Sequence, residues 1–453
     1  MGTSFTEWVS SVSNLVWGAP LLILLVGTGI YLTIRLGFIQ ITKLPYALKL
    51  AFTKQEDSKQ SEGDISHFQA LMTALAATVG TGNIVGVATA VVLGGPGAIV
   101  WMWLSGLFGM ATKYAEAILA VKYRVVDEKG QMAGGPMYYL ERGLKQKWLG
   151  ILFAAFASIA AFGIGNGVQT NSVALAMKST FDVPLYVTGI VLMLATGGVI
   201  LGGVKSIGKV VSFFVPFMIF FYVGSGLLIL IMNYDLIPAA FSTIFSSTFS
   251  NEAITGGAIG AAIRYGVARG VFSNEAGLGS APIAAAAAKT DFPGRQALVS
   301  MTQVFLDTIL VCSMTGLTLV MGGKIGTGLE GVELTTASFE VFLGPTGKYI
   351  VTIGLVLFAF STVLGWSYYG EKSIYYLFGQ KSIVPYRVVF VLVAGMGAMT
   401  TNLNMVWAIS DVFNGLMAIP NLIGLLGLSG VVIAETRLFR EQLKKEQANR
   451  NAS

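Results

Sequence analysis

Long apolar runs, separated by short polar connections, make up most of the chain. A helix needs about 20 apolar residues to cross a bilayer. Eleven stretches have this character: 14–35, 67–93, 97–121, 149–177, 183–203, 208–232, 257–287, 296–322, 347–377, 384–402 and 405–436. The connections between them are too short to hold a separate soluble domain. The pattern therefore predicts an all-α polytopic membrane protein with eleven transmembrane helices in a single domain, 1–453.

The composition supports this assignment and excludes several functions. Hydrophobic residues make up 54% of the chain and charged residues only 11%, against roughly 25% charged residues in soluble domains. The net charge of +6 is spread over the connections, so nucleic acid is not an expected partner. One cysteine, Cys312, and one histidine, His67, leave no basis for a disulfide or a histidine metal site. We also find no phosphate-binding loop and no catalytic constellation, and therefore expect no enzyme activity and no resident cofactor.

The distribution of Lys and Arg predicts the orientation in the membrane. The basic segment 437–453 is placed in the cytoplasm as a tail, because cytoplasmic connections carry an excess of Lys and Arg. With eleven spans the N-terminus is then outside. Connections 36–66 and 122–148 fall inside and are rich in basic residues, whereas 233–256 falls outside and has no Lys or Arg. This separation favours the eleven-span count.

Two of the predicted spans are interrupted by glycine. Span 67–93 contains Gly80 and Gly82 in its middle, and span 257–287 contains Gly277 and Gly279. An opened helix inside a bilayer persists only against protein or a polar cavity. The two interrupted spans are five spans apart and therefore run in opposite directions, which is typical of inverted-repeat transporters. The alternative is a glycine-rich face for helix packing.

Three motifs carry a resemblance to a known family. Val-Gly-Thr-Gly-Asn at 79–83 is similar to the unwound motif of the neurotransmitter:sodium symporters, which have the LeuT fold. The glycine- and tryptophan-rich run 94–109 and the Ser-Asn-Glu-Ala-Gly-Leu-Gly-Ser-Ala-Pro stretch at 273–282 resemble the alanine/glycine:cation symporter family. One departure is Val100, where the family pattern has Phe. The resemblance extends over about residues 10–440.

The resemblance implies a fold and an activity. The expected fold has a LeuT-type 5+5 inverted repeat on spans 2–11, with repeats 67–232 and 257–436 and an extra N-terminal helix at 14–35. The expected activity is symport of alanine and glycine into the cell by alternating access, in the plasma membrane of a prokaryote surrounded by membrane lipid. Na⁺ is the expected co-transported ion, H⁺ is an alternative, and an ion channel is a more distant one.

Polar groups at the two breaks and in a third span are the candidate substrate ligands. By resemblance, the backbone N–H groups of Thr81 and Gly82 hold the amino-acid carboxylate, as opened helix N-termini do for anions. Asn166 and Gln169 lie three residues apart and are expected on one helix face, although helix–helix hydrogen bonding is an equal alternative. The full candidate set is Thr78, Gly80, Thr81, Gly82, Asn83, Asn166, Gln169, Phe272, Ser273, Asn274, Gly277 and Trp366.

Adjacent hydroxyls in span 347–377 are the candidate ion ligands. Ser361 and Thr362 could simply bond to the preceding turn of their own helix. The resemblance implies instead that they complete a sodium site with the carbonyls of Ala76 and Val79. A site made only of oxygen atoms suits a hard cation.

Carboxylates within the spans are further candidates. Asp307 lies in the middle of span 296–322, near Gln303, and could carry a proton. Lys113 and Glu116, three residues apart in span 97–121, are most simply a local ion pair.

Overall fold

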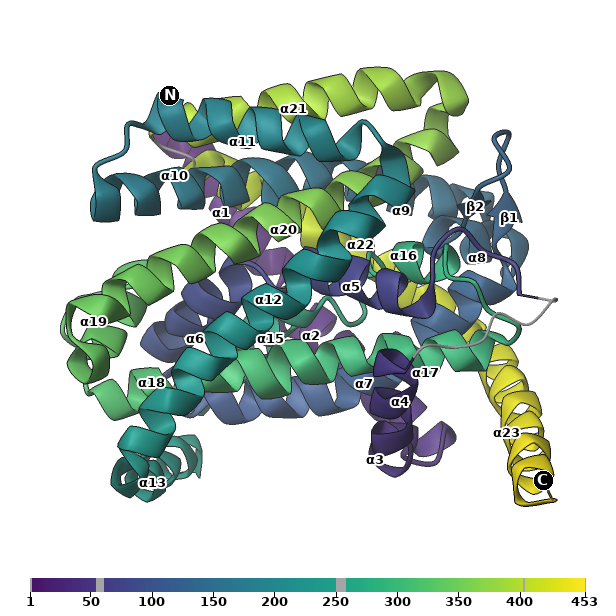
Figure 1. The fold of residues 1–453 in the computed structure, drawn as a ribbon, viewed down its shortest axis with the longest axis horizontal. Helices are drawn as coiled ribbons and strands as arrows, with labels where there is room; N and C mark the ends of the chain where they lie inside the picture. The colour runs from purple at the N-terminus through teal and green to yellow at the C-terminus, as the bar shows by residue number, and fades with distance from the viewer. Residues whose placement is uncertain (1, 54–60, 250–257, 402–403, 453) are drawn as a thin grey trace.

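The computed structural model describes residues 2–53, 61–249, 258–401 and 404–452. Most helices run alongside one another in a bundle, with connections and short helices at its two ends (Figure 1). The predicted limits at residues 257, 402 and 453 lie outside the described residues. The all-α architecture is confirmed.

Within the described ranges, seven helices are long and apolar enough to cross a membrane, and a bent helix pair makes an eighth candidate. These eight correspond to eight of the eleven predicted stretches, and the eleven-span count stays a prediction. The spans are α1–α2 (Gly2–Val16, Ala19–Arg35), the bent pair α5 (His67–Thr78) with η1–α6 (Gly82–Gly86, Val87–Gly94), α9–η2–α10 (Lys147–Phe162, Gly163–Gly167, Val168–Phe181), α12 (Gly203–Met232), α17–η4–α18 (Pro293–Val304, Phe305–Cys312, Ser313–Gly322), α20 (Pro345–Phe378), α21 (Ile383–Met399) and α22 (Asn404–Gly427).

The three other predicted stretches are also helical. They form α7 (Ala98–Lys122), α11 (Leu185–Ile200) and the interrupted segment α15–α16 (Ala258–Asn274, Pro282–Ala286). Of these, α11 has 16 residues and α15 has 17, so each is short for a span, which needs about 20. In η1, η2 and η4 the helix widens to a π-turn, a local change of helical register that is frequent at functional sites.

The longer connections contain structure that hydropathy did not reveal. They hold two short strands, β1 (Val125–Val126) and β2 (Met132–Ala133), which pair antiparallel with Val125 opposite Ala133. Their helices are α3 (Ile39–Thr42), α4 (Leu44–Phe52), α8 (Pro136–Arg142), η3 (Tyr234–Leu236), α13 (Ile237–Phe249) and α19 (Gly331–Leu343), and the short connection between α20 and α21 holds η5 (Gln380–Ser382). All are shorter than a span, so a window of about 20 residues averages them with their polar surroundings.

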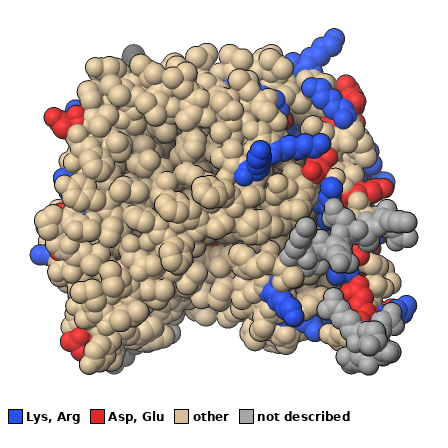
Figure 2. All heavy atoms as spheres, in the orientation of Figure 1, with Lys and Arg blue, Asp and Glu red and all other residues tan. Residues whose placement is uncertain are grey.

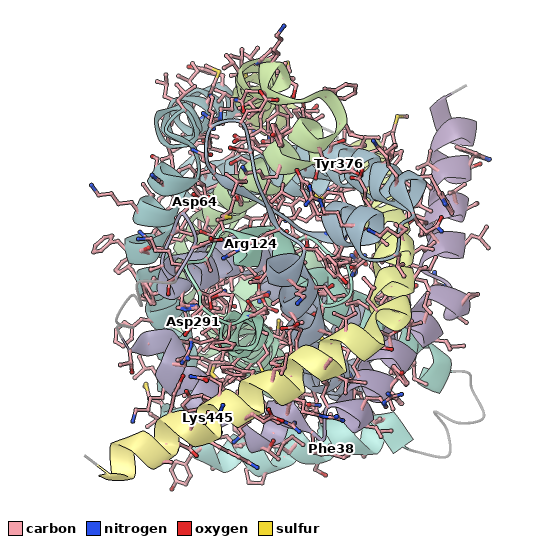
Figure 3. The ribbon with its side chains drawn as sticks, turned by 90° about the vertical axis from the view of Figure 1, so that its right-hand side faces the viewer. Phe38, Asp64, Arg124, Asp291, Tyr376 and Lys445 are labelled. Atoms are coloured by element: carbon pink, nitrogen blue, oxygen red, sulfur yellow. The ribbon has the colours of Figure 1, made fainter. Side chains whose placement is uncertain are left out.

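The end of the chain differs from the prediction. Helix α22 ends at Gly427, and the predicted eleventh span therefore does not continue to residue 436. A new helix, α23 (Ser429–Ala452), follows and lies across one end of the bundle (Figure 3). It is held there because Arg440 donates to the Leu36 carbonyl at 2.5 Å and Glu446 pairs with Arg295 at 2.6 Å. The expected tail is a docked helix.

Charged side chains gather at the end of the bundle that carries β1, β2, α8 and α23, while a broad belt beside it is uncharged (Figures 1 and 2). An uncharged belt is what contact with the hydrocarbon region of a bilayer requires. Large apolar side chains such as Phe213 (81% exposed) and Phe220 (79% exposed) lie on its surface. The arrangement fits a protein that crosses the membrane several times.

Helix α20 lies at the centre of the bundle and packs against α5, α9, α10 and α12. Its close approach to α5 depends on Gly365, because a Cβ atom there would come within 2.6 Å of the Ala77 backbone nitrogen. The contact brings the middle of α20 next to the interruption that follows α5. The candidate site is built at this point.

Candidate functional site

The first break separates α5 from η1. The helix stops at Thr78, Val79 is extended (φ −76°, ψ 95°), and helical structure resumes at Gly82 after a bend of 53°. The Gly80 N–H donates to Asn83 Oδ1 at 2.8 Å. Asn83 therefore satisfies part of the backbone that the break opens, and in this structure its Oδ1 is bonded to the Gly80 N–H of its own segment.

The second break separates α15 from α16. Gly277 (φ +90°) and Gly279 (φ +87°) adopt backbone conformations that favour glycine, and the backbone of Glu275 is in the left-handed region as well (φ +57°). Lys113 reaches across from α7 and donates to the Glu275 carbonyl at 2.9 Å. The glycines that marked this span in the sequence are therefore required by the non-helical segment between Asn274 and Pro282.

A narrow cavity lies between the two breaks. The volume open to the centre of a water-sized sphere is about 20 Å³. A single water molecule needs about 10–15 Å³ on this measure, so the cavity is barely larger than one water. Seven of the predicted substrate residues line it: Thr78, Gly80, Thr81, Gly82, Gln169, Phe272 and Trp366. Ala77, Ile164, Glu275, Thr362 and Asn414 complete the lining. The structure thus brings α5, η1, α10, α15 and α20 together around one small polar space.

Gln169 is bonded to the first break. Its Nε2 donates to Thr81 Oγ1 at 3.1 Å and to the Ile164 carbonyl at 2.9 Å, and its Oε1 accepts from the Thr81 N–H at 3.3 Å. The amide thus lines the cavity and also occupies the Thr81 N–H. Gly82 begins η1, where a helix has no internal partner for its N–H.

The remaining predicted residues do not line the cavity. Asn166 points to α21 and donates to the Phe390 carbonyl at 2.8 Å. Asn274 donates to Thr308 Oγ1 at 3.0 Å and accepts from the Ala276 N–H. In this structure both amides connect helices, and for Asn166 this is the alternative that the sequence left open.

Asp307 joins the two breaks. Its buried carboxylate accepts from Asn83 of the first break at 2.8 Å and from Ser273 of the second break at 2.9 Å. Thr308 adds a third donor at 2.9 Å. The sequence identified Asp307 as a mid-span carboxylate but gave no sign of these partners, because π-turn η4 sets the direction of the side chain.

Glu116 fixes the second break from the side of α7. One carboxylate oxygen accepts from the N–H groups of Gly277 and Gly279, both at 3.1 Å, and from Asn421 of α22 at 2.7 Å. The expected ion pair with Lys113 is present at 3.5 Å. Gly277, proposed from the sequence as a substrate ligand, therefore has its N–H bonded to Glu116. The role of Glu116 was missed because nothing in the sequence links the two segments.

A second contact between the broken segments lies at the charged end of the bundle. Arg124 donates to the carbonyls of Ala288 and Glu62, both at 2.8 Å, and Asp64 accepts from the Met132 N–H at 2.7 Å (Figure 3 labels Arg124 and Asp64). Burial raises the pKa of the Asp64 carboxyl and lowers the pKa of the Arg124 guanidinium. This contact ties the segment before α5 to the segment after α16.

The four predicted ion ligands converge. Ser361 Oγ lies 3.2 Å from the Ala76 carbonyl oxygen and 3.4 Å from that of Val79, and Thr362 Oγ1 lies 3.3 Å from the latter. Both hydroxyls also donate to the Phe358 carbonyl, so the back-bonding alternative is present as well. Oxygen ligands placed about 2.4 Å from a hard cation in octahedral geometry are about 3.4 Å apart. The cluster therefore has suitable spacing for such an ion. In the described part of the chain no group of three His, Cys, Asp or Glu residues could hold a metal.

The fold is shared with solved transporters. A crystal structure of MhsT in complex with L-phenylalanine matches with a TM-score of 0.57 at 14% identity, over 83% of this chain and 99% of that one. A manganese transporter of Eremococcus coleocola matches with a TM-score of 0.50 at 13% identity, over 81% of this chain and 78% of that one. At these identities the likeness shows the fold alone, and it is the fold of the LeuT-like transporters.

The chain belongs to the sodium:alanine symporter family, whose model matches residues 2–453. It is similar to the sodium/alanine symporter AgcS of Methanococcus maripaludis, with 64% identity over 98% of this chain and 99% of the relative. It is also similar to a probable sodium/glutamine symporter, GlnT, of Bacillus subtilis, with 37% identity over 96% and 91% of the two chains. The protein is a transporter and not an enzyme.

Proposed function

We propose that the protein couples the entry of Na⁺ to the uptake of alanine and glycine by alternating access. The observation that carries this proposal is the oxygen cluster of Ala76, Val79, Ser361 and Thr362 beside the cavity. The name of the 64% identical relative, a sodium/alanine symporter, supports the ion and the first substrate. Glycine is inferred from the resemblance and from the small size of the cavity.

Ion and substrate meet at Thr362. This residue belongs to the oxygen cluster through its hydroxyl and also lines the cavity. We assign the carboxylate of the amino acid to the N–H groups of Thr81 and Gly82, where it would replace the Gln169 oxygen. Phe272 and Trp366 then limit the side chain by their size. A cation bound next to this carboxylate lowers the electrostatic cost of holding it in the membrane, which couples the two ligands.

The eleven-span 5+5 architecture is part of this proposal. It is supported by two interrupted helices, one in each of the segments 67–232 and 257–436, that border the same cavity. Such discontinuous helices at a repeat interface are typical of transporters that rock around a fixed site. The bonds of Glu116 hold the second break to α7, and those of Arg124 tie the segment before α5 to the segment after α16. We expect both sets of contacts to change as the protein rocks.

The deciding experiment is uptake of labelled alanine into proteoliposomes with an imposed gradient of either Na⁺ or H⁺. We expect an inward Na⁺ gradient to drive accumulation and a proton gradient alone to have no effect. Accumulation driven by protons without Na⁺ would favour the proton-coupled alternative. Alanine-independent currents through single proteins would favour a channel.

The hydrogen bonds of Asp307 to both breaks predict that removing one of them impairs transport. Asp307→Asn keeps the shape of the side chain, but one of its oxygens becomes an NH₂ group that cannot accept from Asn83 or Ser273. We expect alanine uptake to fall roughly tenfold or more, as for a buried group that loses a hydrogen-bonded partner. Asp235→Asn, a change in η3 outside the site, is the control. Wild-type uptake by Asp307→Asn would show that the network is dispensable.

The proposed orientation predicts which ends of the protein are accessible. Cysteines placed at Tyr234 and Lys445, both exposed, should react on opposite sides of the membrane. We expect an impermeant thiol reagent added to intact cells to label Tyr234→Cys but not Lys445→Cys, and to label both after permeabilisation. The native Cys312 is buried and serves as the background. Labelling of Lys445→Cys alone in intact cells would reverse the orientation.

A further inference from the structure

A groove of about 290 Å³ opens on the outer surface of the bundle beside α12. We call it the α12 groove. Its lining is entirely apolar and comes from four elements: Phe52 of α4, Met72 and Leu75 of α5, Leu306 and Leu310 of η4, and Pro216, Ile219, Phe220, Val223, Gly224 and Leu227 of α12. It is separate from the cavity between the breaks and shares no lining residue with it.

The sequence explains why a groove forms at this place. Gly224 has no side chain, and a Cβ atom there would have no neighbour within 4 Å, so the surface of α12 is open at this point. Pro216 lies inside the same helix, where it removes a backbone hydrogen bond. On the opposite wall, η4 is a π-turn, which spaces Leu306 and Leu310 differently from an α-helix. Three departures from regular helix packing therefore meet at one apolar depression.

The surroundings of the groove indicate what fills it. Phe220 at its edge is 79% exposed, so α12 presents this face to the surroundings, which for an apolar helix of a multi-pass protein are lipid. Lys209 lies seven residues, or about two turns, before Pro216 on the same face of α12. Lys49 lies three residues before Phe52 on α4, again on the same face. Both lysines are exposed, and the two helix segments that carry them, α4 and the beginning of α12, lie toward the end of the bundle where charges gather (Figures 1 and 2).

We propose that the α12 groove binds one acyl chain of an anionic phospholipid from the cytoplasmic leaflet, with the headgroup on Lys49 and Lys209. On the same measure one water molecule needs only about 10–15 Å³, so the groove has room for a run of several methylene groups. Lipid tails are as apolar as the groove itself, so packing alone gives little preference over bulk lipid. The two lysines supply the selectivity, because each attracts anionic headgroups at the membrane surface.

The position of the groove connects it with the site. Met72 and Leu75 precede the Ala76 carbonyl on α5, and Leu306 and Leu310 flank Asp307 on η4. A chain in the groove therefore packs against residues next in sequence to those that carry the oxygen cluster and the Asp307 network. The inference does not depend on the transported substrate.

Photocrosslinking tests the acyl chain. The full-length protein is reconstituted in phosphatidylglycerol vesicles that contain a trace of phosphatidylglycerol with a diazirine on one acyl chain, and crosslinked peptides are identified by mass spectrometry. We expect adducts concentrated on the α5 and η4 residues of the groove. Gly224→Phe should fill the groove and reduce those adducts roughly tenfold, as expected where a bulky group displaces a bound one. Gly198→Phe, at an exposed α11 glycine that likewise has open space around it, is the matched control and should leave them unchanged.

A second measurement tests the headgroup. The same crosslinking is repeated with the diazirine on phosphatidylcholine, in phosphatidylcholine vesicles. We expect the wild type to prefer phosphatidylglycerol, and this preference to disappear in Lys49→Gln/Lys209→Gln. The control is Lys381→Gln/Lys444→Gln, which changes two exposed lysines, one in η5 and one on α23, and should keep the preference. Equal labelling of groove peptides by both lipids in the wild type would overturn the anionic assignment. Adducts spread evenly over the lipid-facing helices, or unaffected by Gly224→Phe, would overturn the site itself.

Discussion

Replacing Ser361 and Thr362 together by alanine should weaken the apparent Na⁺ affinity of alanine uptake while the protein stays folded. The oxygen cluster would keep the carbonyls of Ala76 and Val79 but lose both hydroxyls, which lie 3.2 to 3.4 Å from them. A hard cation with fewer oxygen ligands binds less tightly. We expect the Na⁺ concentration for half-maximal uptake to rise by roughly tenfold or more, the usual scale for changes around a bound metal.

The control for this double variant is on the same helix. Ser367 is buried in α20, and the bond found for its hydroxyl is to the Leu364 carbonyl of its own helix, at 2.7 Å. Ser367→Ala therefore removes a back-bonded hydroxyl without touching the cluster. Uptake is measured against Na⁺ concentration in proteoliposomes, and thermal unfolding of each purified variant reports its stability. If the double variant keeps the wild-type sodium dependence, the two hydroxyls serve only to pack α20 against α5.

Local signals in the sequence located the breaks and the oxygen cluster. Gly277 and Gly279 have positive φ angles, so the need for glycine is visible in the sequence itself. The oxygen cluster was expected from a resemblance of local motifs, and Ser361 and Thr362 do lie against the carbonyls of Ala76 and Val79. The breaks are properties of short segments and do not depend on how distant helices pack. The oxygen cluster joins α5 to α20, and only the resemblance, not the local sequence, placed its two halves together.

Contacts between distant helices could not be predicted in the same way. Asn166 and Gln169 are three residues apart and were expected on one face, but π-turn η2 widens the helix just before Gln169. Gln169 bonds to the first break, whereas Asn166 bonds to α21. The bonds of Glu116 to the second break likewise join segments that are more than a hundred residues apart. Such pairings depend on tertiary packing, which helical periodicity alone does not specify.

Gly82→Val should abolish alanine binding. A Cβ atom at Gly82 would lie 3.2 Å from both Phe272 Cδ1 and Ser273 Cα, so the neighbours would have to move even for alanine. The two further methyl groups of valine would enter the cavity next to the proposed carboxylate position, and β-branching restricts the side chain from turning away. We expect alanine affinity to fall by roughly a hundredfold or more, because a blocked N–H group leaves the carboxylate unpaired.

Gly86→Val is the matched control, since Gly86 is the last residue of the same π-turn and a Cβ atom there has no neighbour within 4 Å. Competition against labelled alanine in equilibrium binding completes the test. A site that pairs both charged ends rejects ligands that lack either end. Glycine should therefore compete, propionate and ethylamine should not, and leucine and phenylalanine should compete weakly because Phe272 and Trp366 wall the cavity. Strong competition by propionate, or undiminished alanine binding by Gly82→Val, would place the carboxylate elsewhere and leave the first break a structural feature of α5.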